Sequence, residues 1–219
     1  MPGRGGVRRN ARGLWRTERR LRAEGLRLIA GVDEAGRGPL AGPVVAAAAV
    51  VPIPCRLPGL ADSKLLSAGQ RERLFELIQR RAISIGIGVA DVRMVDRLNV
   101  LRATHFAMRQ AIAQLDPEPE LALVDGRGLP EAPVPQRGVV RGDRLCGSIA
   151  AASIVAKVVR DRLMAELDER YPEYGFGQHK GYATPYHLAR LRELGPCPEH
   201  RMSFAPVREA LQGRLPLAE

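Results

Sequence analysis

The sequence has few cysteines and no long hydrophobic run. Its three cysteines, Cys55, Cys146 and Cys197, lie far apart and form no Cys-x-x-Cys pair. Neither a disulfide framework nor a cysteine zinc site is therefore expected, and a reducing cytosol fits. The apolar run at residues 43–54 is too short to cross a bilayer and is broken by prolines, so we expect a buried strand there. No signal-type apolar stretch precedes Asp33, and we expect a cytoplasmic protein with no secretion signal and no membrane partner.

Lysine is also scarce, because only three of the 34 basic residues are lysines. The formal charge of +10 is typical of nucleic-acid-binding proteins, but most of it lies near the N-terminus. The first 28 residues hold nine arginines and two glutamates, a net charge of +7, and the remaining body carries only +3. We expect residues 1–27 to be a basic, flexible arm that attracts phosphate, and residues 28–219 to be one folded domain. The alternative for the arm is a solvated terminus without a role.

Two adjacent acids and a glycine-rich turn stand together in the motif GVDEAGRGPLAGPVV. Asp33 and Glu34 end a short apolar run, which predicts a strand that delivers both carboxylates to an edge of a sheet and ends there. Gly36 and Gly38 permit a tight turn whose backbone can approach a ligand, because no Cβ stands in the way. Arg37 between them offers a planar donor group suited to phosphate. An ordinary charged β-turn between two core strands is the alternative interpretation.

The rest of the chain alternates strand and helix patterns. Hydrophobic periodicity predicts further strands at residues 44–51, 83–89, 121–125 and 139–140. Capping patterns and helical spacing predict helices at residues 67–81, 99–115, from 148 onward, 185–194 and 206–211. The helix from residue 148 begins with alanines and serines, which suggests close backbone packing or a surface kept free of bulky groups. His105 lies on an apolar helical stripe and is expected to be a core histidine rather than a ligand.

Acids recur at the ends of apolar strands. Asp125 ends the fourth strand, and Asp143 follows the short fifth strand. Carboxylates gathered at one sheet edge repel one another unless cations lie among them, and Mg²⁺ and Mn²⁺ prefer oxygen ligands. Two such ions about 4 Å apart can catalyse phosphodiester cleavage. Asp143 is the least secure of these acids. Three others could take its place: Asp62, Asp96 and Asp161.

Six motifs occur together and in an order that resembles the bacterial ribonuclease HII family. They are GVDEAGRGPLAGPVV, LADSKLLS, NVLRAT, LALVDG, VVRGD followed by SIAAASIVAKVVRD, and QHKGYAT, and they cover about residues 29–211. The resemblance implies an α/β protein with an RNase H-like fold, a five-stranded mixed sheet flanked by helices, and a small C-terminal helical extension at about residues 172–219. It also implies a monomeric endonuclease that hydrolyses RNA paired with DNA and cuts 5′ of single ribonucleotides embedded in duplex DNA.

The resemblance further implies a role for each candidate residue. Two divalent cations, Mg²⁺ or Mn²⁺, would be held by the catalytic carboxylates Asp33, Glu34, Asp125 and Asp143. The ribonucleotide and its 2′-hydroxyl, the group that distinguishes RNA from DNA at a site, would contact Gly36, Arg37 and Gly38. Tyr182 would pack on the sugar beside the RNA–DNA junction. Phosphates would be held by Arg37 and Lys64, with Lys157 and Lys180 as weaker candidates. Cleavage would leave 3′-hydroxyl and 5′-phosphate ends and serve ribonucleotide excision repair and RNA primer removal.

Three other classes of protein are alternatives. Members of the related ribonuclease HIII family lack the arginine in the glycine turn and carry an extra N-terminal domain, so Arg37 and the short arm favour type HII. A non-catalytic nucleic-acid-binding protein could keep the fold, although it would not need clustered carboxylates. An integrase- or resolvase-like nuclease would cut DNA without a 2′-hydroxyl. The sequence departs from the family in two places: Arg141 stands where lysine is usual, and Cys146 with Gly147 stands where small polar residues are usual. Cys146 near the metals could make the site sensitive to oxidation.

Overall fold

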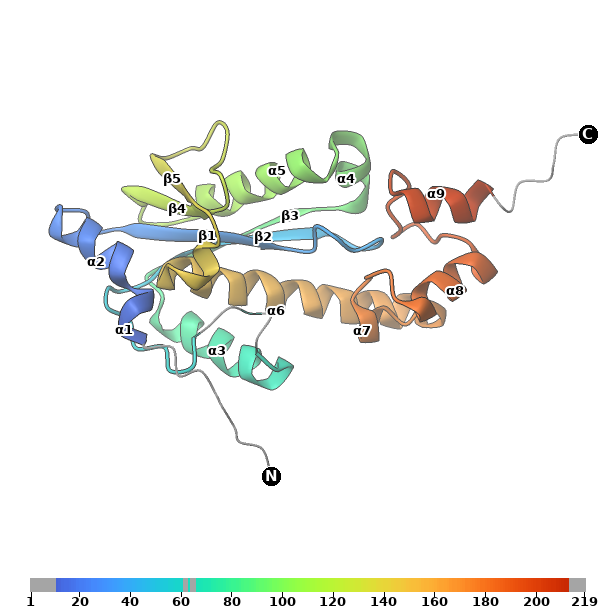
Figure 1. The fold of residues 1–219 in the computed structure, drawn as a ribbon, viewed down its shortest axis with the longest axis horizontal. Coiled ribbons are helices and arrows are strands. Elements are labelled where there is room, and N and C mark those ends of the chain that lie inside the picture. The colour runs from blue at the N-terminus through green and yellow to red at the C-terminus, as the bar shows by residue number, and fades with distance from the viewer. Residues whose placement is uncertain (1–10, 61–62, 64–65, 213–219) are drawn as a thin grey trace, which may run out of the picture.

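The computed structural model describes residues 11–60, 63 and 66–212, which form a five-stranded sheet with helices on both faces (Figure 1). The strands are β1 (Ile29–Ala35), β2 (Val44–Val50), β3 (Ser84–Ala90), β4 (Leu121–Asp125) and β5 (Gln136–Val139). Their spatial order is β3-β2-β1-β4-β5. β1, β2 and β3 pair antiparallel, whereas β4 pairs parallel with β1 and β5 parallel with β4. The predicted mixed sheet is confirmed.

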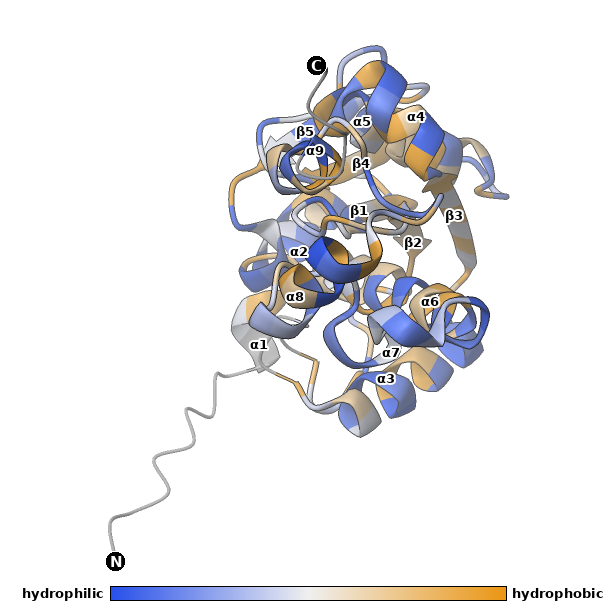
Figure 2. Ribbon diagram, turned by 90° about the vertical axis from the view of Figure 1, so that its right-hand side faces the viewer, coloured by the Kyte–Doolittle hydropathy of each residue, from blue (hydrophilic) through white to orange (hydrophobic). Residues whose placement is uncertain are grey.

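Two helical layers cover the sheet. α4 (Val92–Leu98) and α5 (Val100–Ala113) lie on one face, and α3 (Ala68–Arg81) and the long α6 (Gly147–Arg170) lie on the other (Figure 1). Figure 2 looks from the end that carries α8 and α9 and shows the strands between these two layers. The α3 capping box, in which Ser67 and Gln70 bond each other's main chain, forms as predicted.

Small residues let the helices approach the strands closely. A Cβ built on Gly31 of β1 would lie 2.0 Å from the carbonyl carbon of Ser148 in α6. Gly86 and Gly88 of β3 stand in the same relation to main-chain carbonyls of α5, at 2.0 and 1.9 Å. The alanine-rich start of α6 is buried, so the close backbone packing predicted for it is confirmed.

The C-terminal extension consists of short helices packed beyond the end of the β1–β2 loop (Figure 1). They are η3 (Pro172–Tyr174), α7 (Phe176–His179), α8 (Pro185–Leu194) and α9 (Ala205–Gln212). Leu40 of the β1–β2 loop packs against Leu191 of α8 and Val207 of α9, so the extension is joined to this loop by a core of its own. Across the described residues, no helix combines the length and apolar character needed to cross a membrane.

The basic arm departs from its prediction. Residues from 11 onward form α1 (Ala11–Leu14) and α2 (Arg16–Ala23), and Trp15 and Leu21 are buried against the domain. The fully buried Glu18 carboxylate accepts hydrogen bonds from the main-chain N–H and the hydroxyl of Ser148, at 2.9 and 2.8 Å. A flexible arm is therefore wrong for residues 15–27, because this segment supplies an apolar face and a cap to the start of α6. Residues 1–10 lie outside the described residues.

Smaller departures concern the middle of the chain. β5 occupies Gln136–Val139 rather than residues 139–140. The single helix expected at 99–115 is preceded by α4, and Asn99 separates the two with a φ of 69°. The Asn99 side chain caps α5 by accepting from the N–H groups of Leu101 and Arg102. His105 is half-buried rather than part of the core, and desolvation lowers its pKa.

Candidate active site

The predicted carboxylates meet because β1 and β4 are parallel neighbours. Val32 pairs with Val124, so Asp33 and Asp125 follow at the same edge of the sheet. Asp143 lies in a short turn, η2 (Gly142–Arg144), directly before α6. Asp33, Asp125 and Asp143 line one cavity of about 270 Å³ together with Glu34. β1 does not end at these acids as expected but continues to Ala35, and both of its acids still reach the cavity.

Burial and mutual repulsion dominate the electrostatics of the site. The pKa of Asp33 is raised well above its usual value, first by desolvation and then by the charges of Glu34 and Asp125. Desolvation also raises the pKa of Glu34, against the opposing effect of Arg37, whose guanidinium lies 3.1 Å from the Glu34 carboxylate. One arginine does not compensate the cluster, so an added cation would favour the ionised carboxylates.

The glycine turn forms a wall of the same cavity, which Gly36, Arg37, Gly38 and Tyr182 also line. Gly36 has a φ of +94°, and a Cβ there would meet the Arg160 side chain at 2.0 Å, so both conformation and space require glycine. A Cβ at Gly38 would meet only the Tyr182 ring, at 3.7 Å. Gly38 and Tyr182 are exposed, so a ligand can approach this backbone and the ring together.

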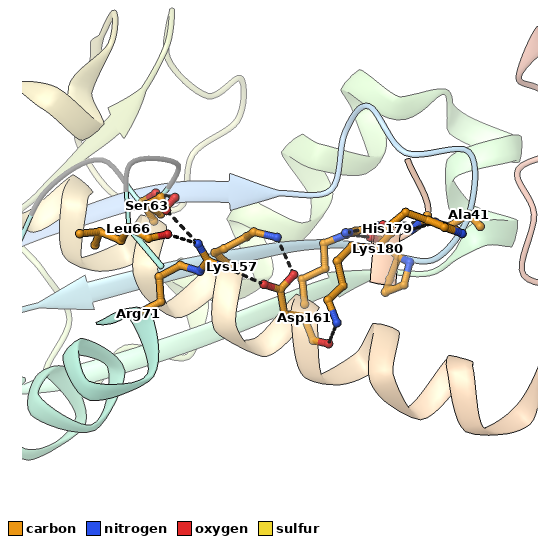
Figure 3. Close-up of polar contacts among 12 residues, drawn as sticks. Ala41, Ser63, Leu66, Arg71, Lys157, Asp161, His179 and Lys180 are labelled. Atoms are coloured by element: carbon orange, nitrogen blue, oxygen red, sulfur yellow. Dashed lines mark hydrogen bonds and ion pairs between the residues drawn. The ribbon is translucent and has the colours of Figure 1, made fainter. Parts of the chain in front are cut away.

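The three lysines differ in position. Lys157 lines the cavity and pairs with Asp161, and desolvation lowers its pKa. Lys180 does not line the cavity, because its ammonium group donates to the Asp161 carbonyl at 3.4 Å (Figure 3). Its position does not support the expected phosphate contact. Lys64 lies outside the described residues.

Sequence reasoning missed three polar residues that line the cavity: Ser63, Ser153 and Arg160. The Ser153 and Ser63 hydroxyls lie at hydrogen-bond distance, 2.9 Å apart, and the Ser153 hydroxyl also hydrogen-bonds the Asp33 carboxylate. Ser153, Lys157 and Arg160 are spaced by four and three residues on α6, so they share one helical face. That spacing was the signal that could have found the two missed residues of α6.

The alternative acids have other partners. Asp161 pairs with Arg71 and Lys157, as Figure 3 shows, and Asp96 accepts from the main chain of Met202 and Ser203. Neither lines the cavity, and Asp62 lies outside the described residues. Asp143 is thus the acid that the fold brings to the site. As placed, no three His, Cys, Asp or Glu side chains of the described part already form a metal-coordination group.

Comparison with known proteins gives one consistent family. A family model described as ribonuclease HII matches residues 30–207. Ribonuclease HII of Geobacillus thermodenitrificans is 56% identical over 198 residues, which cover 90% of this chain and 76% of that protein. Ribonuclease HII of Geobacter sulfurreducens is 54% identical, with 90% of this chain and 91% of the relative covered.

Solved structures agree in fold. The ribonuclease H2 of Pyrococcus horikoshii is 30% identical with a TM-score of 0.73, over 85% of this chain and 98% of that one. The RNase HII solved in a PCNA complex from Archaeoglobus fulgidus is also 30% identical, with a TM-score of 0.65 over 75% and 85% of the two chains. Bst-RNase HIII in complex with Mn²⁺ is 21% identical with a TM-score of 0.68, covering 88% and 72%, a likeness of fold alone.

Proposed function

We propose, from the premise that the chain belongs to the ribonuclease HII family, that it cuts duplex DNA on the 5′ side of single embedded ribonucleotides. Membership makes it a type HII ribonuclease H, an endoribonuclease of RNA–DNA hybrids. The observation that carries the finer proposal is the shared cavity, in which four carboxylates lie beside the glycine turn and Tyr182. A scissile phosphate and the neighbouring 2′-hydroxyl could therefore be bound at one place.

The residues of the cavity suit hard divalent cations. All four acidic ligands offer oxygen, and the raised pKa values of Asp33 and Glu34 reflect a cluster in need of positive charge. We propose that Asp33, Glu34, Asp125 and Asp143 hold two ions, Mg²⁺ or Mn²⁺. When bound, such ions supply activation of the attacking water and stabilisation of the departing 3′ oxygen, and hydrolysis leaves 3′-hydroxyl and 5′-phosphate ends.

The other residues would bind and orient the substrate. The exposed backbone at Gly38 can approach a sugar hydroxyl, and only RNA carries that hydroxyl at the 2′ position. The half-exposed Tyr182 ring beside Gly38 can pack against the same sugar. Arg37 is 50% exposed and bonds Glu34 through one nitrogen, which leaves other guanidinium donors facing solvent for a phosphate. Lys157 would add positive charge at the cavity wall.

The place of this reaction in the cell follows from its products. An enzyme that nicks DNA 5′ of a ribonucleotide starts the removal of misincorporated ribonucleotides, and one that degrades hybrids removes RNA primers. We propose both roles for this protein, acting as a cytoplasmic monomer on hybrid and ribonucleotide-containing duplexes.

The test is cleavage, in magnesium, of a labelled DNA duplex with one ribonucleotide beside an all-DNA duplex of the same sequence. A single cut on the 5′ side of the ribonucleotide, with the all-DNA duplex intact, is the expected result. Cutting of both duplexes would contradict the ribonucleotide specificity and favour an integrase-like nuclease. No cutting in magnesium or manganese would favour a binding protein instead.

A further inference from the structure

A fully buried arginine far along the chain holds the glycine turn. Arg201 lies between α8 and α9 and is 0% exposed. Its Nε donates to the Gly42 carbonyl at 3.0 Å, and one terminal nitrogen donates to the carbonyls of Arg37 and Pro39 at 3.0 and 2.8 Å. The other terminal nitrogen donates to the carbonyls of Gly36 and Gly42 at 2.6 and 2.8 Å. All these acceptors belong to the loop between β1 and β2.

The five hydrogen bonds equal the number of donors in a guanidinium group. Arg201 therefore has no donor left for a phosphate, and burial keeps it from touching nucleic acid. Any effect of this side chain on the substrate must pass through the loop that it holds. Lysine, with three donors on a single nitrogen, could not satisfy the same set of carbonyls.

Because the peptide bond is planar, holding a carbonyl of the turn also fixes the direction of the N–H group of the following residue. In a trans peptide, the carbonyl of one residue and the N–H of the next point in opposite directions. Because Arg201 holds the carbonyls of Gly36 and Arg37 inward, the N–H groups of Arg37 and Gly38 are directed away from it. Arg37 and Gly38 are the exposed residues of the turn and line the carboxylate cavity. The arginine thus sets the direction of two main-chain donors at the site.

A second residue, Asp96 of α4, holds the segment that directly follows Arg201. The Asp96 carboxylate on α4 accepts from the N–H groups of Met202 and Ser203, both at 2.9 Å, and from the Ser203 hydroxyl at 2.6 Å. These residues directly follow Arg201. A continuous chain of contacts therefore runs from α4 through the segment after α8 to the glycine turn, and Asp96 is half-buried rather than part of the core.

We propose that Arg201 is the positioning residue of ribonucleotide recognition, with Asp96 as its support. This proposal rests on the proposed function of the same site. Arg201 orients the N–H groups of the turn toward the ribose. Its loss therefore lowers the cleavage rate at a ribonucleotide but leaves the affinity for all-DNA duplex unchanged. If Arg201 served the fold alone, its loss would lower the melting temperature and leave the ratio of ribonucleotide cleavage to DNA binding unchanged.

The experiment compares the full-length wild type with Arg201→Lys and Asp96→Ala. The control is Asp91→Ala, which removes another α4 carboxylate, the N-cap that accepts from Met94 N–H at 2.7 Å, without touching residues 201–203. For each variant we would measure kcat and KM on the duplex with one ribonucleotide, the inhibition constant of the all-DNA duplex, and the melting temperature.

We expect kcat/KM to fall by about 100-fold in Arg201→Lys and about tenfold in Asp96→Ala, the scale of a misplaced reacting group. The inhibition constant of the all-DNA duplex should stay within about twofold of wild type. The control Asp91→Ala should keep the wild-type kcat/KM, although its melting temperature is similar to that of Asp96→Ala. Equal kcat/KM in Asp96→Ala and Asp91→Ala would overturn the proposal, and so would unchanged kcat/KM in a folded Arg201→Lys. If Arg201→Lys does not fold, Asp96→Ala decides. If the wild type itself does not distinguish the duplexes, the proposed function has failed before any variant is measured.

Discussion

The Asp125 carboxylate accepts a hydrogen bond of 2.6 Å from the main-chain N–H of Gly142, the residue before Asp143. The acid at the end of β4 therefore also fixes the turn that carries the last carboxylate of the cavity. Gly142 has little freedom there, because a Cβ would meet the Ile149 side chain at 2.4 Å and the Asp125 carboxylate at 3.3 Å. The charge of Asp125 and its hydrogen bond can be separated by mutation.

Asp125→Asn should nearly abolish cleavage while leaving hybrid binding largely intact. An amide oxygen can still accept from Gly142 N–H, so the turn keeps its position and only the charge is lost. Asp125→Ala removes both and should in addition lower the melting temperature, because the Gly142 N–H loses its acceptor. Cleavage and hybrid affinity of the two variants would be measured side by side. Full activity in Asp125→Asn would remove this residue from the catalytic set.

The N-terminal segment calls for two deletions rather than one. Removing residues 1–10 takes away three arginines and should weaken hybrid affinity and flatten its salt dependence. Removing residues 1–27 also removes Trp15, Leu21 and the Glu18 cap of α6, and should lower the melting temperature sharply. Affinity measured from low to high salt, together with thermal unfolding, separates the two effects. An unchanged salt slope in the shorter deletion would make those arginines bystanders.

Glu18→Gln refines the second effect. The side chain is fully buried and its pKa is raised, mainly by desolvation, so the neutral amide avoids the cost of a buried charge while keeping an acceptor for Ser148. Glu18→Ala leaves the buried Ser148 N–H without that acceptor and should cost about 1–3 kcal/mol of unfolding free energy. Chemical denaturation of both variants at pH 7 should place Glu18→Gln close to wild type and Glu18→Ala clearly below it. Equal loss in both would mean that the charge itself is needed.

The sheet and its acids were predictable because they depend on short patterns. Alternating or continuous apolar runs mark the strands, and the parallel pairing of β1 with β4 brings Asp33 and Asp125 to one edge. Lys180 illustrates what such patterns leave open, because residue type does not tell the direction of a side chain. A left-handed backbone with φ of 52° at Lys180 accompanies a side chain that contacts α6 instead of the cavity.

Long-range relations account for what the sequence could not reveal. The many arginines of the arm favoured a solvated segment, although Trp15, Glu18 and Leu21 are buried. These three residues are spaced by three, which places them on one helical face toward α6. Arg201 looked like one more basic residue, and its role depends on contacts with a loop about 160 positions earlier. No local pattern encodes which arginine will be buried.

Gly31→Ala should destabilise the protein, because its Cβ would lie 2.0 Å from the main chain of Ser148 and neither β1 nor α6 can move freely. We expect a loss of about 1–3 kcal/mol, the usual effect of overpacking a core. Gly69→Ala on α3 is the matched control, since nothing lies within 4 Å of its Cβ and alanine favours a helix. Denaturant unfolding should show loss in the first variant and a small gain in the second. Equal stability of Gly31→Ala and wild type would contradict the close approach of α6.

Treatment with peroxide would show whether Cys146 makes the site sensitive to oxidation. The thiol is fully buried, and desolvation together with the Glu18 charge raises its pKa to about 12. Thiolate, the form that peroxide attacks, is therefore scarce at neutral pH. Mild peroxide treatment should leave cleavage activity unchanged, and Cys146→Ser should respond in the same way. A loss of activity in the wild type that Cys146→Ser prevents would show that the thiol is accessible.

Two buried histidines form a hydrogen-bonded chain within the C-terminal extension, and this chain ends at the main chain of Tyr182. The Cys197 N–H donates to His200 Nδ1 at 3.0 Å, so the His200 proton resides on Nε2 and is donated to His187 Nε2 at 3.0 Å. His187 then carries its proton on Nδ1 and donates it to the Tyr182 carbonyl at 2.8 Å. Both rings must be neutral for this chain, because an added proton would set two N–H groups against each other.

The contribution of these two histidines to stability should therefore fall as the pH is lowered from about 6.5 to 4. Desolvation lowers the pKa of His187 and of His200 to about 4, whereas unfolded histidine titrates near 6.5. In this window the unfolded chain binds protons that the folded protein does not, so acid favours unfolding by up to about 1.4 kcal/mol per pH unit for each histidine. Above pH 6.5 both states are neutral, and this contribution is constant. Unfolding free energies of the wild type and of a His187→Gln/His200→Gln variant would be measured across the range. The variant should be less stable at pH 7 and show a shallower decline toward pH 4, and an equally steep decline would assign the acid sensitivity to other groups.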